Sequence, residues 1–473
     1  MTLRGDARLI PLAVAVSLLA AVGGALTAAL AYETSPAIPL AVAAGLAILA
    51  LAIAMPIRLV YVAILLVPFK LYTIDLKALG LPPGAGLSLP EGLFVLSGVA
   101  WAIGRLAVGK WPVIPSPLGK PYALLLLAIV PGLVMAIHPF PVVKMLVMWT
   151  ALFLVYQMIV ADGRPETVRT ILLALAVAAA VVGLKAAIAP GSEQPQLLGL
   201  GEVAEGRPGG AFEDPNILAT FEALGLPAAV ALALGRGLLV RAVGAVSFGL
   251  IVAGLSLSLS RGGFLAAAGA LAVMLAWRPF RYTGVAALLI FLALQSASGG
   301  SLFGQIEQTS LVEGRLQSVT YAAAGGDPRF AIWRTTPEMI AAHPFFGIGA
   351  NQFPDVSLRY GLFTEDLRGS YQHAHNLPLT IAAELGLVGL AALLWASFAL
   401  ARVLLGAARR LQGHDRGVAI AIAAAFAGLA LQGMVDYTIS SNTIAAVTFV
   451  LAGCAVVMWR SAPAQPESDA ASA

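Results

Sequence analysis

The chain carries the stretch LIPLAVAVSLLAAVGGALTAALA at residues 9–31, which holds no charged side chain over 23 residues. An α-helix rises about 1.5 Å per residue, so a run of this length crosses a hydrocarbon layer about 30 Å thick. The apolar core of a cleavable signal peptide is shorter, about 7–15 residues, and here more apolar runs follow. We therefore expect residues 9–31 to be a retained membrane-spanning helix.

The composition extends this conclusion to the whole chain. Of its 473 residues, 59% are hydrophobic and 11% are charged, whereas a soluble domain has about 25% charged residues. The single cysteine, Cys454, excludes an intrachain disulfide. We expect an all-α, polytopic membrane protein with about 12–14 transmembrane helices. Apolar runs that predict spans lie at residues 9–31, 36–55, 57–74, 88–104, 121–137, 142–160, 168–189, 215–234, 242–259, 262–277, 282–298, 376–401, 417–436 and 443–459.

The distribution of charge predicts the orientation. With the N-terminus in the cytoplasm, 17 of the 28 lysines and arginines fall on the cytoplasmic side, but only 6 of the 24 acidic residues do. Cationic loops are retained on that side during insertion. The basic excess is thus a topology signal, and no basic patch interleaved with aromatic residues indicates nucleic-acid binding. We expect both termini to be cytoplasmic.

Three regions follow from this topology. Residues 1–200 form N-terminal transmembrane helices, residues 201–460 form the region that carries the chemistry, and residues 461–473 form a disordered cytoplasmic tail rich in Ala, Ser and Pro. Two loops, 190–214 and 299–375, face the periplasm. A loop as long as the second is usually functional.

The long loop is predicted to be partly helical. Asp327 with Pro328 and Thr336 with Pro337 are each a helix N-cap followed by a first-turn proline. Two short helices should therefore begin there. Phe330, Trp333 and Ile340 would form an apolar face that lies on the membrane or on the other helices.

Four ionisable residues far apart in sequence share the outer side in this topology: Arg207, Arg261, Arg329 and His375. An arginine at a helix end is commonly an interface anchor. Its planar guanidinium also suits phosphate oxygens, so several arginines together could hold a diphosphate. A histidine exchanges protons near neutral pH, so His375 could act as a general base. His373 and His375 could instead form a metal pair, although this pair has no evident third ligand.

At these residues the sequence resembles the O-antigen ligase and O-antigen polymerase superfamily of membrane glycosyltransferases, over roughly residues 205–400. His375-Asn-Leu-Pro-Leu-Thr-Ile-Ala-Ala-Glu-Leu-Gly-Leu-Val-Gly389 is similar to the ligase pattern of a histidine followed by two spaced glycines. Three further segments resemble family motifs in the same order. They are Arg207–Asn216, Ser260-Arg261-Gly262, and Arg329-Phe-Ala-Ile-Trp333 with His343-Pro-Phe-Phe-Gly-Ile-Gly349.

The resemblance implies an inner-membrane enzyme that transfers a glycan, with inversion, from undecaprenyl diphosphate to an acceptor hydroxyl on the periplasmic face. It implies His375 as the catalytic residue, and Arg207, Arg261 and Arg329 as ligands of the diphosphate. Asn216, Trp333 and Asn376 would support the site. The ligase-type histidine pattern favours lipid A core as the acceptor, and no metal or other cofactor is expected.

Alternatives remain open at this point. A polymerase would use the same lipid-linked donor with a second lipid-linked repeat as acceptor, and a protein hydroxyl is a third acceptor. Glu213 and Asp214 could form a weak cation site. A transporter would place ionisable residues near the middle of the membrane, where Glu222 and Glu384 are the acids in predicted spans.

Overall fold

The computed structural model describes residues 45, 48–69, 73–74, 86–188, 209–212, 214–282, 328–360 and 372–463. The predicted span 9–31 and most of 36–55 and 282–298 lie outside these residues, as do most of the loop 190–214, much of the loop 299–375 and most of the C-terminal tail. The elements are α3 (Pro56–Leu66), η2 (Val67–Phe69), β1 (Thr73–Ile74), β2 (Leu87–Ser88), α4 (Leu89–Ala107), α5 (Gly119–Ile129), α6 (Gly132–Met135), α7 (Pro139–Asp162), α8 (Pro165–Ile188), α9 (Pro215–Ala233), α10 (Leu238–Ser258), α11 (Arg261–Met274), α15 (Pro328–Ala342), α16 (Phe353–Ser357), η4 (Leu358–Tyr360), α17 (Leu377–Arg410), α18 (Gly413–Gly433), η6 (Thr438–Ser440) and α19 (Asn442–Ser461).

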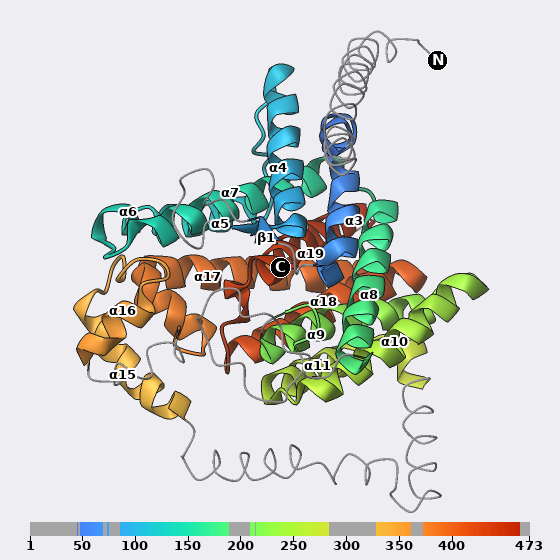
Figure 1. Ribbon diagram of the computed structural model, residues 1–473. Coiled ribbons are helices and arrows are strands. Elements are labelled where there is room, and N and C mark those ends of the chain that lie inside the picture. Colours follow the sequence, from blue (N-terminus) through green and yellow to red (C-terminus); the bar gives the residue numbers. More distant parts are fainter. Residues whose placement is uncertain are drawn as a thin grey trace, which may run out of the picture.

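The protein is an all-α polytopic membrane protein, as the composition predicted. Within the described residues, eight helices are long and apolar enough to span a membrane, and three shorter apolar helical stretches accompany them. The strands β1 and β2 have two residues each and pair antiparallel. In Figure 1, α7 and α17 run across the view, and α3, α4 and α8 cross them steeply.

Small residues allow the helices around the site to approach closely. A Cβ on Gly428 of α18 would lie 2.7 Å from the Ala266 carbonyl oxygen of α11, and one on Gly263 of α11 would overlap the Ala219 side chain of α9. Helix association in lipid depends on van der Waals packing and not on hydrophobic burial, so small residues favour such contacts. As a result α9, α11 and α18 form a tight group.

Where the sequence predicted two helices, starting at Pro328 and Pro337, the described part of the long loop forms the single helix α15, and the short α16 and η4 follow it. The start at Pro328 is confirmed, because α15 begins there. The second start was wrong, since Pro337 lies inside α15. The Thr336 hydroxyl donates to the Ile332 carbonyl at 2.7 Å and so satisfies a backbone acceptor one turn before the proline.

The apolar face of α15 also differs from the expected one. Ile332 and Met339 are fully buried, and Trp333 and Ile340 pack at the margin of the same small core. Phe330 is 38% exposed and contacts the Trp333 ring edge-on. This core joins α15 to α16 and to the start of α17, and it holds residues 328–360 against α17 (Figure 1).

Candidate active site

The first turn of α17 presents the predicted histidine. The Asn376 side chain caps this helix by accepting the Leu379 N–H at 2.9 Å, and its amide donates to the Met434 carbonyl at 2.8 Å. His375 precedes the cap with φ 47°, a left-handed conformation that is uncommon for a residue other than glycine. Such backbone conformations persist where the surroundings fix them, and they cluster at functional sites.

His375 is paired with a carboxylate that the sequence analysis did not select. Its Nδ1 lies 3.0 Å from Oδ1 of Asp436, which follows α18. The same oxygen accepts the Tyr437 backbone N–H at 2.8 Å. The Asp436 side chain is 7% exposed. We call this pair the His375–Asp436 dyad.

Asp436 is ionised in this environment. Burial acts to raise the pKa of its carboxyl, but the hydrogen bond with His375 and the nearby His373 and Arg329 outweigh it and lower this pKa to about 2. Burial and the neighbouring His375 lower the pKa of His373 to about 3, so His373 is neutral at physiological pH. The carboxylate thus faces His375 as an anion and keeps the imidazole proton on Nδ1.

Arg329 lies on the other side of the carboxylate. Its guanidinium donates to the Val435 carbonyl at 2.8 Å, and it lies 3.8 Å from Oδ2 of Asp436. The Trp333 indole, one turn further along α15, donates to the Ala374 carbonyl at 2.8 Å. These two bonds fix α15 to the segment after α18, at Val435, and to the segment before α17, at Ala374.

The N-termini of α9 and α11 meet at the same place. The Ser260 hydroxyl, the N-cap of α11, donates to the Asn216 side chain at 2.8 Å and accepts the Gly263 N–H at 3.2 Å. Asp214 caps α9 by accepting the Asn216 N–H. Arg261 is the first residue of α11. A Cβ on the next residue, Gly262, would lie 3.3 Å from the Val435 side chain, so the start of α11 lies against Val435, whose carbonyl accepts from Arg329.

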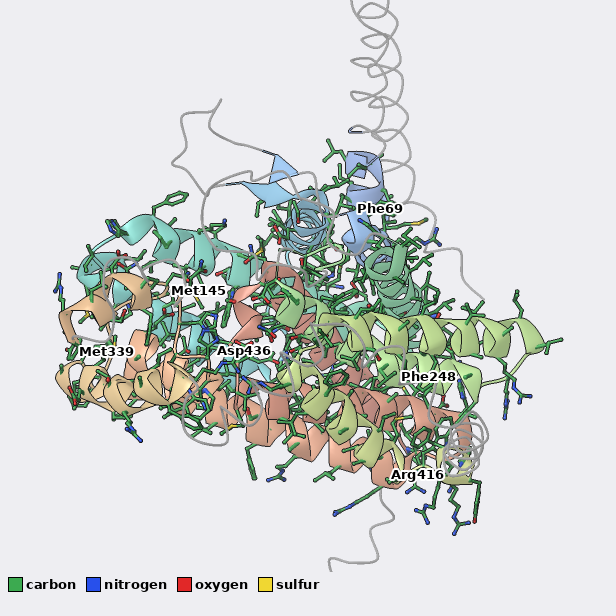
Figure 2. The ribbon with its side chains drawn as sticks, turned by 60° about the horizontal axis from the view of Figure 1, so that its bottom comes forward. Phe69, Met145, Phe248, Met339, Arg416 and Asp436 are labelled. Carbon is green, nitrogen blue, oxygen red and sulfur yellow. The ribbon has the colours of Figure 1, made fainter. Side chains whose placement is uncertain are left out.

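One short segment, Gln432-Gly-Met-Val-Asp-Tyr437, connects all these parts, and we call it the hub segment. Its bonds reach Asn216 from Gln432, Asn376 from Met434, Arg329 from Val435 and His375 from Asp436. Figure 2 labels Asp436 within the fold, on the side toward Met145 and Met339, with Arg416 of α18 well away from it. The hub segment therefore bonds to residues that lie as far as 216 positions away from it in the sequence.

A break in α17 at Gly386 holds residues 344–349 in place. Gly386 has φ 67°, and a Cβ there would collide with the Phe345 carbonyl. Around the break, the Ile348 and Gly349 N–H groups donate to Ala383 and Glu384, and the Leu387 N–H donates to Pro344. The buried Glu384 side chain accepts the backbone N–H groups of Asn351 and Phe353.

Asp436 gives the pair His373 and His375 a third possible metal ligand. One ligand atom from each of His373, His375 and Asp436 lies within 4.8 Å of the others, so these residues could hold a metal ion. In the structure they form a hydrogen-bonded chain instead, because the His373 Nδ1 accepts the His375 backbone N–H at 3.2 Å and His375 contacts Asp436. A direct test of metal dependence is given below.

The structure thus brings together six of the seven residues singled out as site residues, and Arg207 lies outside the described residues. Asp436 is the functional candidate that sequence reasoning missed. The available signal was its position at the outer end of the span 417–436, the side on which His375 was expected. An acid that directly follows an apolar run is easily taken for an ordinary helix end.

The comparisons with known proteins agree with this geometry. Residues 246–394, from α10 to the middle of α17, match the family model described as O-antigen ligase. No curated protein sequence matches the chain. The matched region contains Arg261, Arg329 and His375, and the hub segment lies beyond it. Over this stretch the chain is therefore similar to the O-antigen ligase family.

Proposed function

We propose that the protein is a glycosyltransferase that moves a glycan from undecaprenyl diphosphate to a hydroxyl of lipid A core, with inversion and without a metal. The observation that carries this proposal is the His375–Asp436 dyad, with its 3.0 Å contact, beside Arg329 and near the start of α11, where Arg261 lies. A buried carboxylate, a histidine and arginines in one place suit proton removal from a hydroxyl beside a phosphate leaving group.

The dyad supplies the base. With the proton of His375 on Nδ1 and directed at Asp436, the Nε2 lone pair is the basic position. Nε2 takes the proton of the acceptor hydroxyl as the oxygen attacks the anomeric carbon of the donor sugar. The bond from that carbon to the diphosphate oxygen breaks, and the electron pair leaves with undecaprenyl diphosphate. Asp436 stabilises the imidazolium that forms.

The arginines and helix N-termini supply the positive field. Arg329 donates to the Val435 carbonyl, and the N-termini of α9, α11 and α17 converge on the hub segment, with Arg261 as the first residue of α11. Free N–H groups and the macrodipole at a helix N-terminus favour anions. The negative charge that grows on the leaving diphosphate would therefore be stabilised here.

The function is tested with purified protein in detergent, an undecaprenyl diphosphate-linked glycan as donor and rough-type lipopolysaccharide as acceptor. We expect glycan transfer and release of undecaprenyl diphosphate, and His375→Ala should lose about 10²–10⁴ in rate. His373→Asn is the matched control and should retain activity, because an amide oxygen can accept the His375 backbone N–H. If donor is consumed with a second lipid-linked glycan as acceptor and not with lipopolysaccharide, the enzyme is a polymerase. If no donor is consumed, the enzyme proposal fails.

We also propose that the dyad faces the periplasm. Arg359 in η4 and Lys110 after α4 are both exposed, and they lie on opposite sides of the membrane in the proposed topology. In intact spheroplasts a membrane-impermeant thiol reagent should label Arg359→Cys and not Lys110→Cys, and the buried Cys454 should give no background. The opposite pattern would reverse the orientation.

A further inference from the structure

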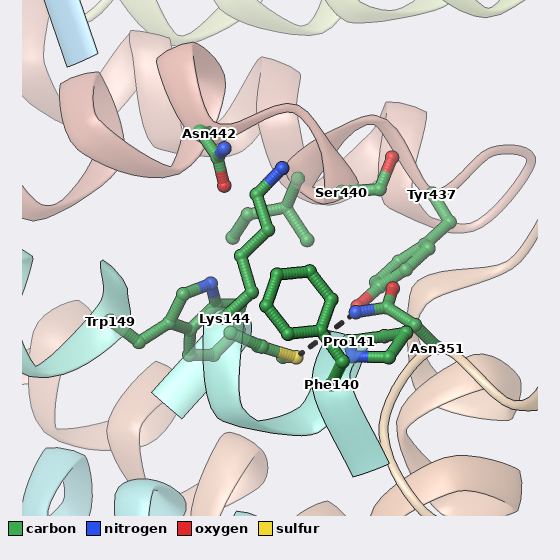
Figure 3. Close-up of a pocket in the computed structure, with 10 residues that line it drawn as sticks. Phe140, Pro141, Lys144, Trp149, Asn351, Tyr437, Ser440 and Asn442 are labelled. Atoms are coloured by element: carbon green, nitrogen blue, oxygen red, sulfur yellow. Dashed lines mark hydrogen bonds between the residues drawn. The ribbon is translucent and has the colours of Figure 1, made fainter. Parts of the chain in front are cut away.

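A cavity of 290 Å³ lies near the dyad, and the residues that line it have no part in the proposed chemical step (Figure 3). It opens between the start of α7, the turn at Asn351, and the segment from Tyr437 to Asn442 that leads into α19. Phe140, Met145, Trp149 and Tyr437 supply aromatic and apolar walls. Its polar groups are those of Lys144, Asn351, Ser440 and Asn442.

This lining suits a sugar ring. The C–H faces of a pyranose are apolar and pack on aromatic rings, whereas its hydroxyl groups need donors and acceptors at the rim. Amide and hydroxyl side chains provide both. The volume is at the small end of the range of about 300–1,000 Å³ for ligand pockets, which fits a sugar unit and not a lipid chain. Lys144, the charged lining residue, favours a sugar that carries a phosphate or carboxylate group.

The cavity and the dyad share a wall. Tyr437, which lines the cavity, directly follows Asp436, and its ring centre lies 5.3 Å from that of His373. The His373 ring in turn lies 4.4 Å from the His375 ring. The cavity therefore adjoins the dyad through the rings of Tyr437 and His373.

The hub segment contacts both Arg329 and this cavity. Val435, which precedes Asp436, accepts a hydrogen bond from Arg329, and Tyr437, which follows Asp436, lines the cavity. An inverting displacement needs its nucleophile on the side of the sugar opposite the leaving group. We infer that the cavity is the subsite for an acidic sugar of the acceptor, an inference that rests on the proposed function.

The inference is tested with Lys144→Gln and Asn442→Ala in the transfer assay, varying acceptor and donor separately. Lys120→Gln is the matched control, because Lys120 is an exposed lysine in α5 that does not line the cavity. Each cavity variant should raise the KM for lipopolysaccharide about tenfold, the effect of about 1.4 kcal/mol. The KM for the lipid-linked donor and the kcat at saturating acceptor should change less than about twofold, which corresponds to less than about 0.4 kcal/mol.

Two results would overturn the assignment: an unchanged KM for lipopolysaccharide, or a raised KM for the donor in its place. A second readout does not depend on turnover. The free core oligosaccharide, released from rough-type lipopolysaccharide by mild acid, is titrated calorimetrically into the wild type and into Lys144→Gln. Weaker binding to the variant supports the cavity even if no donor is consumed, whereas equal binding refutes it.

Discussion

Replacing Asp436 by asparagine keeps the shape of the side chain and removes its charge. The amide oxygen can still accept the Tyr437 N–H and the Nδ1 proton of His375, which now lies 3.0 Å from the Asp436 oxygen. It carries no negative charge, however, to stabilise the imidazolium that forms when Nε2 takes a proton. Asp436→Asn should therefore impair the chemical step more than substrate binding.

The size of the effect follows from the geometry. A unit positive charge on His375 and a unit negative charge on Asp436, 3.0 Å apart, interact by about 5 kcal/mol at an effective dielectric constant of about 20. At about 1.36 kcal/mol per factor of ten, this is close to four powers of ten in rate. Arg329, 3.8 Å from the other oxygen, already offsets part of the carboxylate charge. We therefore expect a loss of about 10²–10⁴ in the single-turnover rate.

The assay is single-turnover transfer in detergent, with donor binding measured in parallel. Asp355→Asn is the matched control, because Asp355 also pairs with a histidine, His138 at 3.7 Å, outside the dyad. The control should transfer at the wild-type rate. The acid stability of the wild type should also depend on Asp436, since its lowered pKa gives stability that is present above the ordinary value of 3.8 and lost as the pH falls through about 2. An Asp436→Asn enzyme that retains a third of the wild-type rate would refute the role of the dyad.

Arg261→Lys and Arg329→Lys should each lower turnover while the protein stays folded, because an ammonium cannot copy a bidentate guanidinium contact with phosphate. The control is Arg334→Lys, on the exposed side of α15, which should have no effect on turnover. Normal activity of both test variants would refute the assignment of these arginines to the diphosphate. EDTA should leave transfer unchanged, and loss of activity that zinc restores would instead assign His373, His375 and Asp436 to a metal. Gly386→Ala should destabilise the protein by about 2–5 kcal/mol, from the left-handed backbone and the overlap with Phe345, measured by thermal unfolding. Gly249→Ala, where the new Cβ meets nothing within 4 Å, should cost no stability.

The membrane helices could be predicted from sequence because lipid imposes one strong rule, a long apolar run with its backbone hydrogen bonds made internally. Helices α7, α8, α9 and α19 begin and end within a few residues of the predicted spans. The rule is weaker where a proline intervenes. The predicted span 121–137 is divided into α5 and α6 at Pro131, because proline has no N–H to continue the ladder.

The site was less predictable because it depends on contacts between distant segments. Motifs indicated His375, Arg329 and Asn216, but nothing local shows that Asp436 faces His375, since that contact requires the ends of α17 and α18 to meet. The cavity lining is dispersed in the same way, from Phe140 to Asn442. Its residues are ordinary aromatic and amide side chains whose shared purpose appears only in three dimensions.

The interruption of α17 at Gly386 also determines which residues must be moved together when a chimera is made from two related proteins. The hydrogen bonds between residues 344–349 and residues 383–388 join the segment before α17 to the helix α17 itself. A chimera joined at the start of α17 would pair one parent's turn with the other parent's helix and leave mismatched backbone donors at the break. Exchange of this region between two related proteins should therefore give a folded chimera only when residues 343–389 move as a single block.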